Sequence, residues 1–415
     1  MQVSGGNFLE MYDFMVFGYY AAAIGRAFFP SGNPFVSLSL SLMTFGAGFL
    51  MRPIGAIVLG AYCDRRGRRA GLILALMLMS LGMISIAFVP GYATIGLAAP
   101  LLVLCGRLLQ GFSAGMELGG VSVYLSEIAT PGHKGFYVSW QSASQQMTVM
   151  MAALLGFQLN RMLTPVQMDA WGWRVPLWIG CMILPLLLML QNSLEETDEF
   201  RSRKHHPSLK QIMHSLAASW QLVALGMMLF TMTTVSFYMI TAYTPTFGTA
   251  VLHLTSVDSF VVTFCVGLSN LVWLPVMGAL SDRIGRLPLL VAATVLMLVT
   301  AYPVMLWLVA GPTFGKLLAV ELWLSLVYGI YNGALIVYMT ELIPFEVRTL
   351  AFSLAYSLAT SVFGGFTPAF STWLIHVTGN RAVPGLWLSF AAACGLVAAL
   401  MTRGRARQLA ATQAG

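Results

Sequence analysis

The sequence predicts an all-α polytopic membrane protein, with twelve transmembrane helices in two pseudo-symmetric six-helix bundles. Its 415 residues are 58% hydrophobic and only 9% charged, against about 45–50% and about 25% in soluble domains. A soluble domain with so few charges could not cover its surface with polar groups. The apolar stretches are long and rarely alternate with a period of two, which favours helices over a β-barrel. A motif repeated in both halves of the chain predicts the two bundles.

Twelve apolar segments follow one another along the chain. A hydrocarbon core of about 30 Å needs roughly 20 apolar residues per helix, so twelve spans use roughly 240 residues and leave room for short loops. We place the spans, in order, at 6–29, 36–61, 70–90, 95–125, 138–160, 171–191, 219–247, 257–280, 288–309, 316–342, 349–375 and 384–402.

The distribution of basic residues predicts the orientation in the membrane. The loops on one side carry fifteen of the 22 Lys and Arg residues and those on the other side carry five, while Arg52 and Arg107 fall inside spans. Cytoplasmic loops are the basic ones. An even number of spans places both termini on one side. We therefore expect both termini in the cytoplasm of a bacterium, with the chain in its inner membrane.

The longest loop divides the chain into two similar parts. We expect an N-terminal bundle over 1–191, a cytoplasmic linker over 192–218, a C-terminal bundle over 219–402 and a cytoplasmic tail over 403–415. The string GAYCDRRGRR at 60–69 returns as GALSDRIGRL at 278–287, with six of ten positions identical. YLSE at 124–127 likewise returns as YMTE at 338–341. Repeated halves are typical of secondary transporters, which hold substrate near the midplane.

Other function classes find little support in the sequence. The net charge of +7 is explained by cytoplasmic loops, so we expect no nucleic-acid partner. The five cysteines form no CxxC pair, and His205 and His206 have no third ligand, so we expect no metal site. No phosphate-binding loop or hydrolase motif is present, so the protein is not expected to be an enzyme.

Several motifs resemble those of known transporters. The repeated loop is similar to the G-x-x-x-D-R-x-G-R-R loop of the major facilitator superfamily. GNFLE (6–10) with YDF (12–14), LMRPIGA (50–56) and GRLLQG (106–111) resemble its metabolite:proton symporter family. ELGGVSVYLSEIATPG (117–132), GFY (135–137) and WQSASQQ (140–146) resemble the citrate– and tricarballylate–proton symporters.

The resemblance implies a function. It implies proton-coupled uptake of citrate or a related tricarboxylate such as tricarballylate by rocker-switch alternating access, with protons as the coupling ion and no other cofactor. The partners are then a small-molecule substrate and the lipid bilayer, and we expect a monomer. A carrier of a dicarboxylate or of a zwitterionic osmolyte stays open as an alternative, because intramembrane acids suit either. A receptor that binds a tricarboxylate without moving it is a third possibility, disfavoured by the short tails.

Ionisable residues inside the spans are candidates for proton coupling. A charge within the bilayer is costly and usually functional. Glu10 and Asp13 lie about 60° apart on one helix face, and span four carries Arg107 and Glu117. In several proton-coupled porters an acid of span one pairs with an arginine of span four, and Asp13 and Arg107 match those positions. The pair acts either as a proton switch or as a permanent bridge between two helices.

A tricarboxylate needs a cation and neutral donors in the cavity. Arg107 is the first candidate, because guanidinium binds carboxylate in a bidentate way; Arg52 either joins it or pairs within its own half. The polar side chains of span five either line the cavity or hold helices together. The predicted substrate-binding residues are Asn7, Arg52, Arg107, Gln141, Ser142, Gln145, Tyr238, Asn270, Tyr331, Asn332 and Tyr356.

The repeated loops are candidates for a gate. Asp64 is expected at the N-terminus of span eleven and Asp282 at that of span five, where free N–H groups favour an anion. The resemblance further implies charge bridges at the cytoplasmic ends. These are Arg65 and Arg68 to Glu127, and Arg283 and Arg286 to Glu341.

Overall fold

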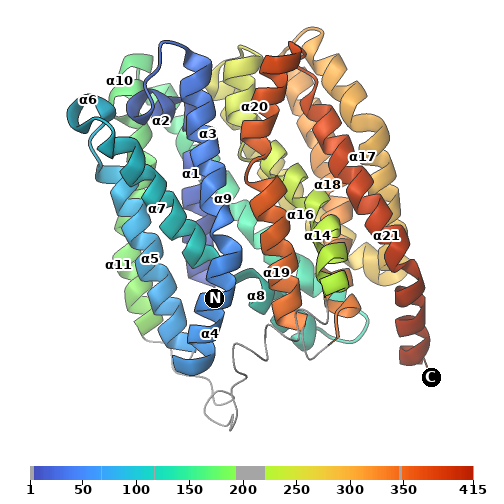
Figure 1. Ribbon diagram of the computed structural model, residues 1–415. Helices are drawn as coiled ribbons and strands as arrows, with labels where there is room; N and C mark the ends of the chain where they lie inside the picture. Colours follow the sequence, from blue (N-terminus) through green and yellow to red (C-terminus); the bar gives the residue numbers. More distant parts are fainter. Residues whose placement is uncertain (1–3, 67, 116, 193–219, 345–347, 415) are drawn as a thin grey trace.

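A computed structural model describes residues 4–66, 68–115, 117–192, 220–344 and 348–414. Within these ranges the regular structure is entirely helical. The helices run roughly parallel to one another in Figure 1. Both described chain ends lie towards the same end of this arrangement, which we call the lower end; the opposite end is the upper end.

The first half of the chain forms the helices on the left of Figure 1. In order they are α1 (Ser4–Tyr19), α2 (Ala21–Phe28), α3 (Pro34–Leu50), α4 (Arg52–Arg66), α5 (Arg68–Phe88), α6 (Tyr92–Ile95), α7 (Ala98–Ala114), α8 (Glu117–Ile128), α9 (Lys134–Met162), α10 (Pro165–Ala170), a 3₁₀ turn (Gly172–Arg174) and α11 (Val175–Asn192).

The second half forms the helices on the right. They are α14 (Trp220–Ile240), α15 (Thr244–Thr246), a π-helical turn (Phe247–Val251), α16 (Ser256–Ile284), α17 (Arg286–Val309), α18 (Phe314–Leu342), α19 (Arg348–Ala359), a second π-helical turn (Thr360–Gly364), α20 (Thr367–Thr378) and α21 (Pro384–Ala414).

Five of the expected single spans are interrupted. The first is split between α1 and α2, the second between α3 and α4, the fourth among α6, α7 and α8, and the seventh between α14 and α15. The eleventh is broken by a π-helical turn next to the Gly364–Gly365 pair. Such breaks occur at glycine, at proline or at an inserted π turn, because these residues weaken or remove the helical hydrogen bond. The expected tail over 403–415 is also different, since α21 continues without a break to Ala414.

Seven helices in the described ranges are long and apolar enough to cross a membrane. They cover Pro34–Leu59, Trp220–Ile240, Ser256–Ile284, Arg286–Val309, Phe314–Leu342, Arg348–Thr378 and Pro384–Gly404, and two shorter apolar helices cover Ile73–Phe88 and Ala98–Ala114. Helices α1 and α9 are not among them. Helix α1 has 16 residues and carries Glu10 and Asp13, and α9 carries Gln141, Ser142, Gln145 and Gln146. These side chains are buried.

Helix starts at the upper end are fixed by side-chain caps. Asn33 accepts a hydrogen bond from the Phe35 N–H at 3.0 Å and precedes Pro34 at the start of α3. Thr255 caps α16 through the Asp258 N–H at 3.0 Å, and Thr313 caps α18 through the Lys316 N–H at 3.2 Å. A cap satisfies an N–H group that the first turn leaves free.

Glycines allow α3 and α4 to lie directly against α7. A Cβ atom on Gly111 would collide with the Gly48 carbonyl, and one on Gly115 would collide with the Arg52 carbonyl. Small residues at such crossings let two backbones approach closely. The close contact brings Arg52 at the start of α4 and Arg107 on α7 towards the same buried region.

The two halves touch at both ends. At the upper end, Thr246 donates to the Gly18 carbonyl at 3.4 Å, and the rings of Phe35 and His376 stack with centroids 3.8 Å apart. At the lower end, α9 packs along α16, and α19 packs against α4 and α8. Contacts therefore join the two halves of the described chain at both ends.

We predict that Gly111→Ala destabilises the fold. The added methyl group has no room beside the Gly48 carbonyl, and overpacking of this kind costs about 1–3 kcal/mol. Thermal unfolding in detergent should show a lower melting temperature. Gly315→Ala is the matched control, because nothing lies within 4 Å of its Cβ position. Equal melting temperatures for the two variants would contradict the close packing.

Candidate substrate and proton-coupling site

Two carboxylates on α1 are buried in the middle of the molecule. Glu10 is 3% exposed and Asp13 is 1% exposed. They stand three residues apart, so they lie on one side of the helix. A buried carboxylate is stable in its charged form only with a partner, and each of the two has an arginine.

Asp13 pairs with Arg107, as the sequence suggests. The Nη1 atom of Arg107 lies 2.8 Å from Oδ2 of Asp13 and also donates to Oε1 of Gln110 at 2.7 Å. The Nε and Nη2 atoms of Arg107 are buried and have no hydrogen-bond partner among the described residues. Arg107 therefore keeps donors that a second anion could occupy.

Arg52 pairs with Glu10 rather than extending to the surface. Its Nη2 atom lies 2.7 Å from Oε1 of Glu10, and its side chain is 1% exposed. Two separate ion pairs thus lie side by side along α1. Their four charges cancel, so the buried region carries no net charge in this state.

Aromatic rings enclose both guanidinium groups. The Cζ atom of Arg107 lies 4.4 Å from the centroid of Phe14 and 4.5 Å from that of Phe17. The Cζ atom of Arg52 lies 4.9 Å from Phe14 and 4.6 Å from Phe49. Phe14 is shared by the two arginines. Ring faces attract cations and exclude water, so they hold the arginines in place without neutralising them.

Two tyrosines from the second half reach the arginines. The Tyr356 hydroxyl on α19 interacts with Arg52. The Tyr238 ring on α14 packs edge-on against Phe49, with centroids 5.1 Å apart. The Tyr238 hydroxyl is buried without a hydrogen-bond partner among the described residues. The charged region of the first half therefore faces hydroxyl groups of the second half.

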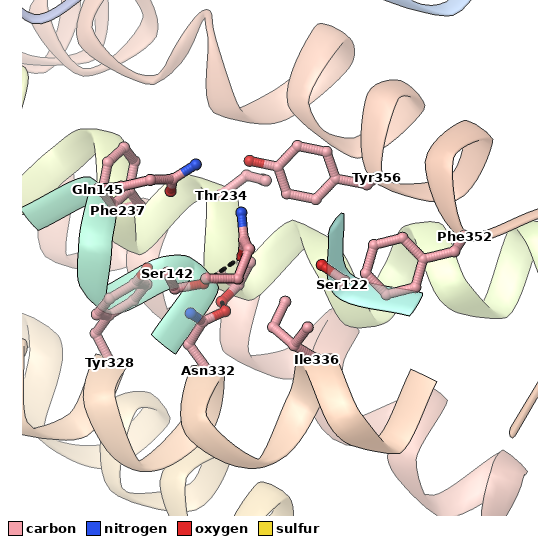
Figure 2. A pocket seen from close by; sticks show the side chains of 12 residues that line it. Ser122, Ser142, Gln145, Thr234, Phe237, Tyr328, Asn332, Ile336, Phe352 and Tyr356 are labelled. Atoms are coloured by element: carbon pink, nitrogen blue, oxygen red, sulfur yellow. Dashed lines mark hydrogen bonds between the residues drawn. The ribbon is translucent and has the colours of Figure 1, made fainter. Parts of the chain in front are cut away.

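A small polar cavity adjoins this region and is shown in Figure 2. Side chains from both halves converge on it, and Tyr356 connects it to Arg52. The lining residues are Ser122 on α8; Gln141, Ser142 and Gln145 on α9; Thr233, Thr234 and Phe237 on α14; Tyr328, Asn332 and Ile336 on α18; and Phe352 and Tyr356 on α19.

The cavity is closed in this structure. Its volume is about 20 Å³, which is room for one water molecule. Its polar groups bond to one another: Ser142 donates to Oε1 of Gln141 at 3.0 Å, and Thr233 donates to Oδ1 of Asn332 at 2.7 Å. The Gln141 Nε2 atom is buried with no partner among the described residues. Any molecule larger than water would have to separate the helices and replace these internal hydrogen bonds to enter the cavity.

A charged cluster joins the halves at the lower end. Both carboxylate oxygens of Asp282, at the end of α16, accept backbone N–H groups at the start of α9: Gly135 at 2.8 Å and Phe136 at 3.0 Å. Arg286 lies 2.7 Å from Asp282 and 3.2 Å from Glu341. Gly278 lies against Gly135, where a Cβ would meet the Gly135 carbonyl at 2.5 Å. We call Asp282, Arg286 and Glu341, with the N-terminus of α9, the lower latch.

The whole chain matches known transporters. Residues 1–403 match the family model described as sugar (and other) transporter. The chain is 57% identical over 401 residues to the citrate-proton symporter of Salmonella typhi, covering 97% of this chain and 92% of that protein. It is 58% identical over 398 residues to the citrate-proton symporter of Klebsiella pneumoniae, covering 96% and 90%.

This chain belongs to the sugar (and other) transporter family. The fold agrees with a solved structure of the xylose transporter XylE from E. coli, of the major facilitator superfamily, with a TM-score of 0.75, 19% identity and 97% coverage of each chain. The predicted all-helical membrane fold is thereby confirmed. Membership of this transporter family also bears out the prediction that the protein is a membrane transporter and not an enzyme.

Several predicted site residues lie elsewhere in this transporter. Tyr331 donates its hydroxyl to the Leu229 carbonyl at 2.8 Å and so joins α18 to α14. Asn270 donates to Gln146 at 3.2 Å and accepts from Ser325 at 2.7 Å, which links α16, α9 and α18. Both side chains act as helix contacts here, because their hydrogen bonds are used away from the cavity.

The gating predictions are met only in part. Asp282 lies at the start of α9, as expected, and Arg286 reaches Glu341. Arg283 was expected to share that role, but it is exposed and forms no ion pair with a described residue. Arg283 follows Asp282 in the last turn of α16, about 100° around the helix, whereas Arg286 begins α17 after the turn at Gly285. Glu127 is exposed. Its expected partners are Arg65 and Arg68, whose side chains lie outside the described part of the structure. The same holds for the side chains of Asp64, Asn7 and Glu117.

Some lining residues are absent from the sequence-based set. Thr233, Thr234 and Tyr328 line the cavity, yet threonine and tyrosine occur in ordinary helix contacts as well. The only sequence signal is helical spacing: Thr234 stands four residues before Tyr238, and Tyr328 stands four residues before Asn332, so each pair shares a helix face. Within the part of the chain that the structure describes, no group of three His, Cys, Asp or Glu side chains could hold a metal ion.

We predict that Asp282→Asn loosens the lower latch. The carboxylate stabilises the N-terminus of α9 and pairs with Arg286. Losing about one to two kcal/mol of this stabilisation changes the ratio of open to closed forms of the lower end roughly 5- to 30-fold. Maleimide labelling of a cysteine at Ser139, which lies against Gly278, should accelerate by about that factor in a background lacking other cysteines. Asp258→Asn, on the same helix at the upper end, should leave the labelling rate unchanged. An unchanged rate in Asp282→Asn would contradict the latch.

Proposed function

We propose that this chain takes up citrate, or a related tricarboxylate such as tricarballylate, together with protons by alternating access. The observation that carries the proposal is the pair of buried arginines, each held by one α1 carboxylate, beside a polar cavity lined from both halves. The names of the relatives that are 57–58% identical support the same substrate.

The site suits a multivalent anion once the α1 carboxylates are protonated. Protonation of Glu10 and Asp13 removes their negative charges and leaves two guanidinium groups that need a counter-charge. Guanidinium binds a carboxylate through two parallel hydrogen bonds. Arg107 already has two buried donors without a partner among the described residues. Two carboxylates of the substrate then take the places of the two α1 carboxylates.

The third carboxyl group and the hydroxyl of citrate need neutral donors. The Gln141, Ser142 and Gln145 side chains on α9 and the Asn332 and Tyr356 side chains facing them offer amides and hydroxyls. No third deep cation lies beside the cavity in its described lining, which favours a substrate that keeps one proton. A site that hydrogen-bonds the citrate hydroxyl would discriminate strongly against tricarballylate.

Coupling follows from competition between the proton and the arginine for each α1 carboxylate. Without protons the arginines are occupied and the anion has no binding site. With protons bound, the anion is attracted and stabilises the protonated carboxyls, because desolvation favours their neutral form. Proton and substrate therefore bind together and leave together.

Alternating access is the movement that fits the closed cavity. The lower latch and the upper contacts around Gly18 close the two ends in this structure. Opening one end while the other stays closed would expose the cavity to one side at a time. We propose that the division into 1–191 and 219–402 marks the two moving bundles, that the lower end faces the cytoplasm of the bacterial inner membrane, and that the monomer is the transporting unit.

The first prediction from this proposal concerns the substrate. Proteoliposomes with an inward proton gradient should accumulate labelled citrate, and an uncoupler should abolish the accumulation. Excess tricarballylate should compete, whereas succinate, which has one carboxyl fewer, should compete weakly. Failure to accumulate or bind any of the three would refute the tricarboxylate assignment and favour a zwitterionic substrate. Binding without accumulation would indicate a receptor.

A second prediction separates proton coupling from anion binding. Asp13→Asn leaves Arg107 without its carboxylate, so citrate exchange should persist while proton-driven accumulation is lost. Arg107→Lys removes the bidentate contact, and citrate affinity should fall roughly 10- to 100-fold. Exchange and net uptake of labelled citrate measure the two effects.

The matched controls are Asp169→Asn and Arg26→Lys. Asp169 and Arg26 form an ion pair with half-exposed side chains, and such pairs contribute little. Both control variants should transport like the wild type. If Asp13→Asn retained full accumulation, Asp13 and Arg107 would be a permanent bridge between α1 and α7 and not a proton switch.

A further inference from the structure

A third buried carboxylate lies in the second half of the chain. Glu321 stands seven residues into α18, near the upper end, and is 2% exposed. It is remote in sequence from the acids of α1 and does not line the cavity. Its Oε2 atom is buried and has no hydrogen-bond partner among the described residues. Neither the ion pairs on α1 nor the lower latch accounts for it.

The Glu321 carboxyl interacts with the Thr244 hydroxyl. The Thr244 Oγ1 atom also lies 2.9 Å from the Ile240 carbonyl and 3.3 Å from the Met239 carbonyl. No described cation neutralises the Glu321 carboxyl. Burial without a counter-charge favours the protonated carboxylic acid.

The charged and titratable groups nearby do not replace that proton. Glu321 forms no ion pair with a described residue. Lys316 on the same helix is directed to the Trp307 carbonyl at 3.2 Å. The other such groups on the upper parts of the packed elements are Asp258 on α16, Tyr302 on α17, Arg161 on α9, Tyr243 beside α15 and Tyr328 on α18, and none of them acts on the Glu321 carboxyl.

The partner of Glu321 lies on the segment that closes the upper end. Thr244 begins α15, which follows a break in α14 and continues into the π-helical turn Phe247–Val251. Two residues further, Thr246 donates to the Gly18 carbonyl at 3.4 Å, and a Cβ on Gly18 would meet Ala242 at 3.3 Å. Separation of the halves at the upper end must therefore displace this segment, and with it the cover over Glu321.

A polar stripe on α18 leads from Glu321 to the cavity. Ser325, Tyr328 and Asn332 follow it at intervals of four, seven and eleven residues, which place all four on one helix face. Ser325 hydrogen-bonds to Asn270 at 2.7 Å, and Tyr328 and Asn332 line the cavity. Once the cavity opens to the lower side and fills with water, this stripe connects the Glu321 carboxyl to that water.

We propose that Glu321 is a second, independent proton-carrying residue of this transporter, an inference that rests on the proposed proton-coupled function. With the upper end open, its carboxylate takes a proton from water on that side and becomes a neutral carboxylic acid. In the closed, substrate-loaded state it keeps the proton, because burial without a counter-charge favours the neutral acid. With the lower end open, the O–H bond breaks and the proton leaves along the α18 stripe to water on the lower side.

The experiment is a measurement of the proton:citrate ratio from reversal potentials in proteoliposomes. Glu321→Gln keeps the shape of the protonated side chain, so citrate exchange should persist and report a folded protein. The ratio should fall by one proton, which lowers the limiting accumulation about 50-fold at a driving force of about 100 mV. Asp258→Asn, an acid at the upper end of the neighbouring helix, should leave the ratio unchanged. An unchanged ratio in Glu321→Gln would overturn the inference.

A second measurement does not depend on the substrate. Infrared difference spectra of the purified protein at neutral pH should show a carboxylic acid C=O band that Glu321→Gln removes and Asp258→Asn leaves in place. If the wild type moves no citrate, the proposed function fails, and this band still decides whether Glu321 holds a proton. Spectra without a band that depends on Glu321 would overturn the proton-carrying role even where citrate transport is normal.

Discussion

The site depends on the cost of placing charge inside a membrane protein. Arg52 and Arg107 are at most 1% exposed, and an unpaired buried charge costs several kcal/mol. Glu10 and Asp13 neutralise them without occupying all their donors. In the proposed mechanism a proton together with an external anion replaces each carboxylate, so the same interaction that stabilises the resting fold would also define what the site can bind.

Backbone packing holds these charges in place. The glycine contacts between α7 and helices α3 and α4 bring the two arginines together. The contact of Gly135 with Gly278 brings α9 within reach of Asp282. Helices in contact through backbone atoms cannot adjust by side-chain rotation, so they move as rigid units. The hydroxyls of Tyr238 and Tyr356, which belong to the second half, can then approach or leave the arginines only when whole helices move.

The sequence predicts the charged part of the site well and the neutral part less well. Intramembrane ions are rare and need partners, so Asp13, Glu10, Arg107 and Arg52 could be found by composition and spacing alone. Asn270 and Tyr331 could not be assigned, because a polar residue on a helix face can bond to a cavity or to the next helix with the same sequence pattern. Arg283 lies in the last turn of α16 and Arg286 begins α17, and the two could be separated only once the turn at Gly285 was known.

In the proposed mechanism, electrostatic neutrality keeps protons and substrate from crossing separately. With the α1 carboxylates ionised and the cavity empty, the two arginines are balanced. With both carboxylates protonated and a substrate dianion bound, they are balanced again. Protons without substrate leave two excess positive charges in the closed cavity, and substrate without protons leaves two excess negative ones. Closing around either excess carries the cost of buried unpaired charge, so only the two neutral states can pass through the closed conformation at a useful rate.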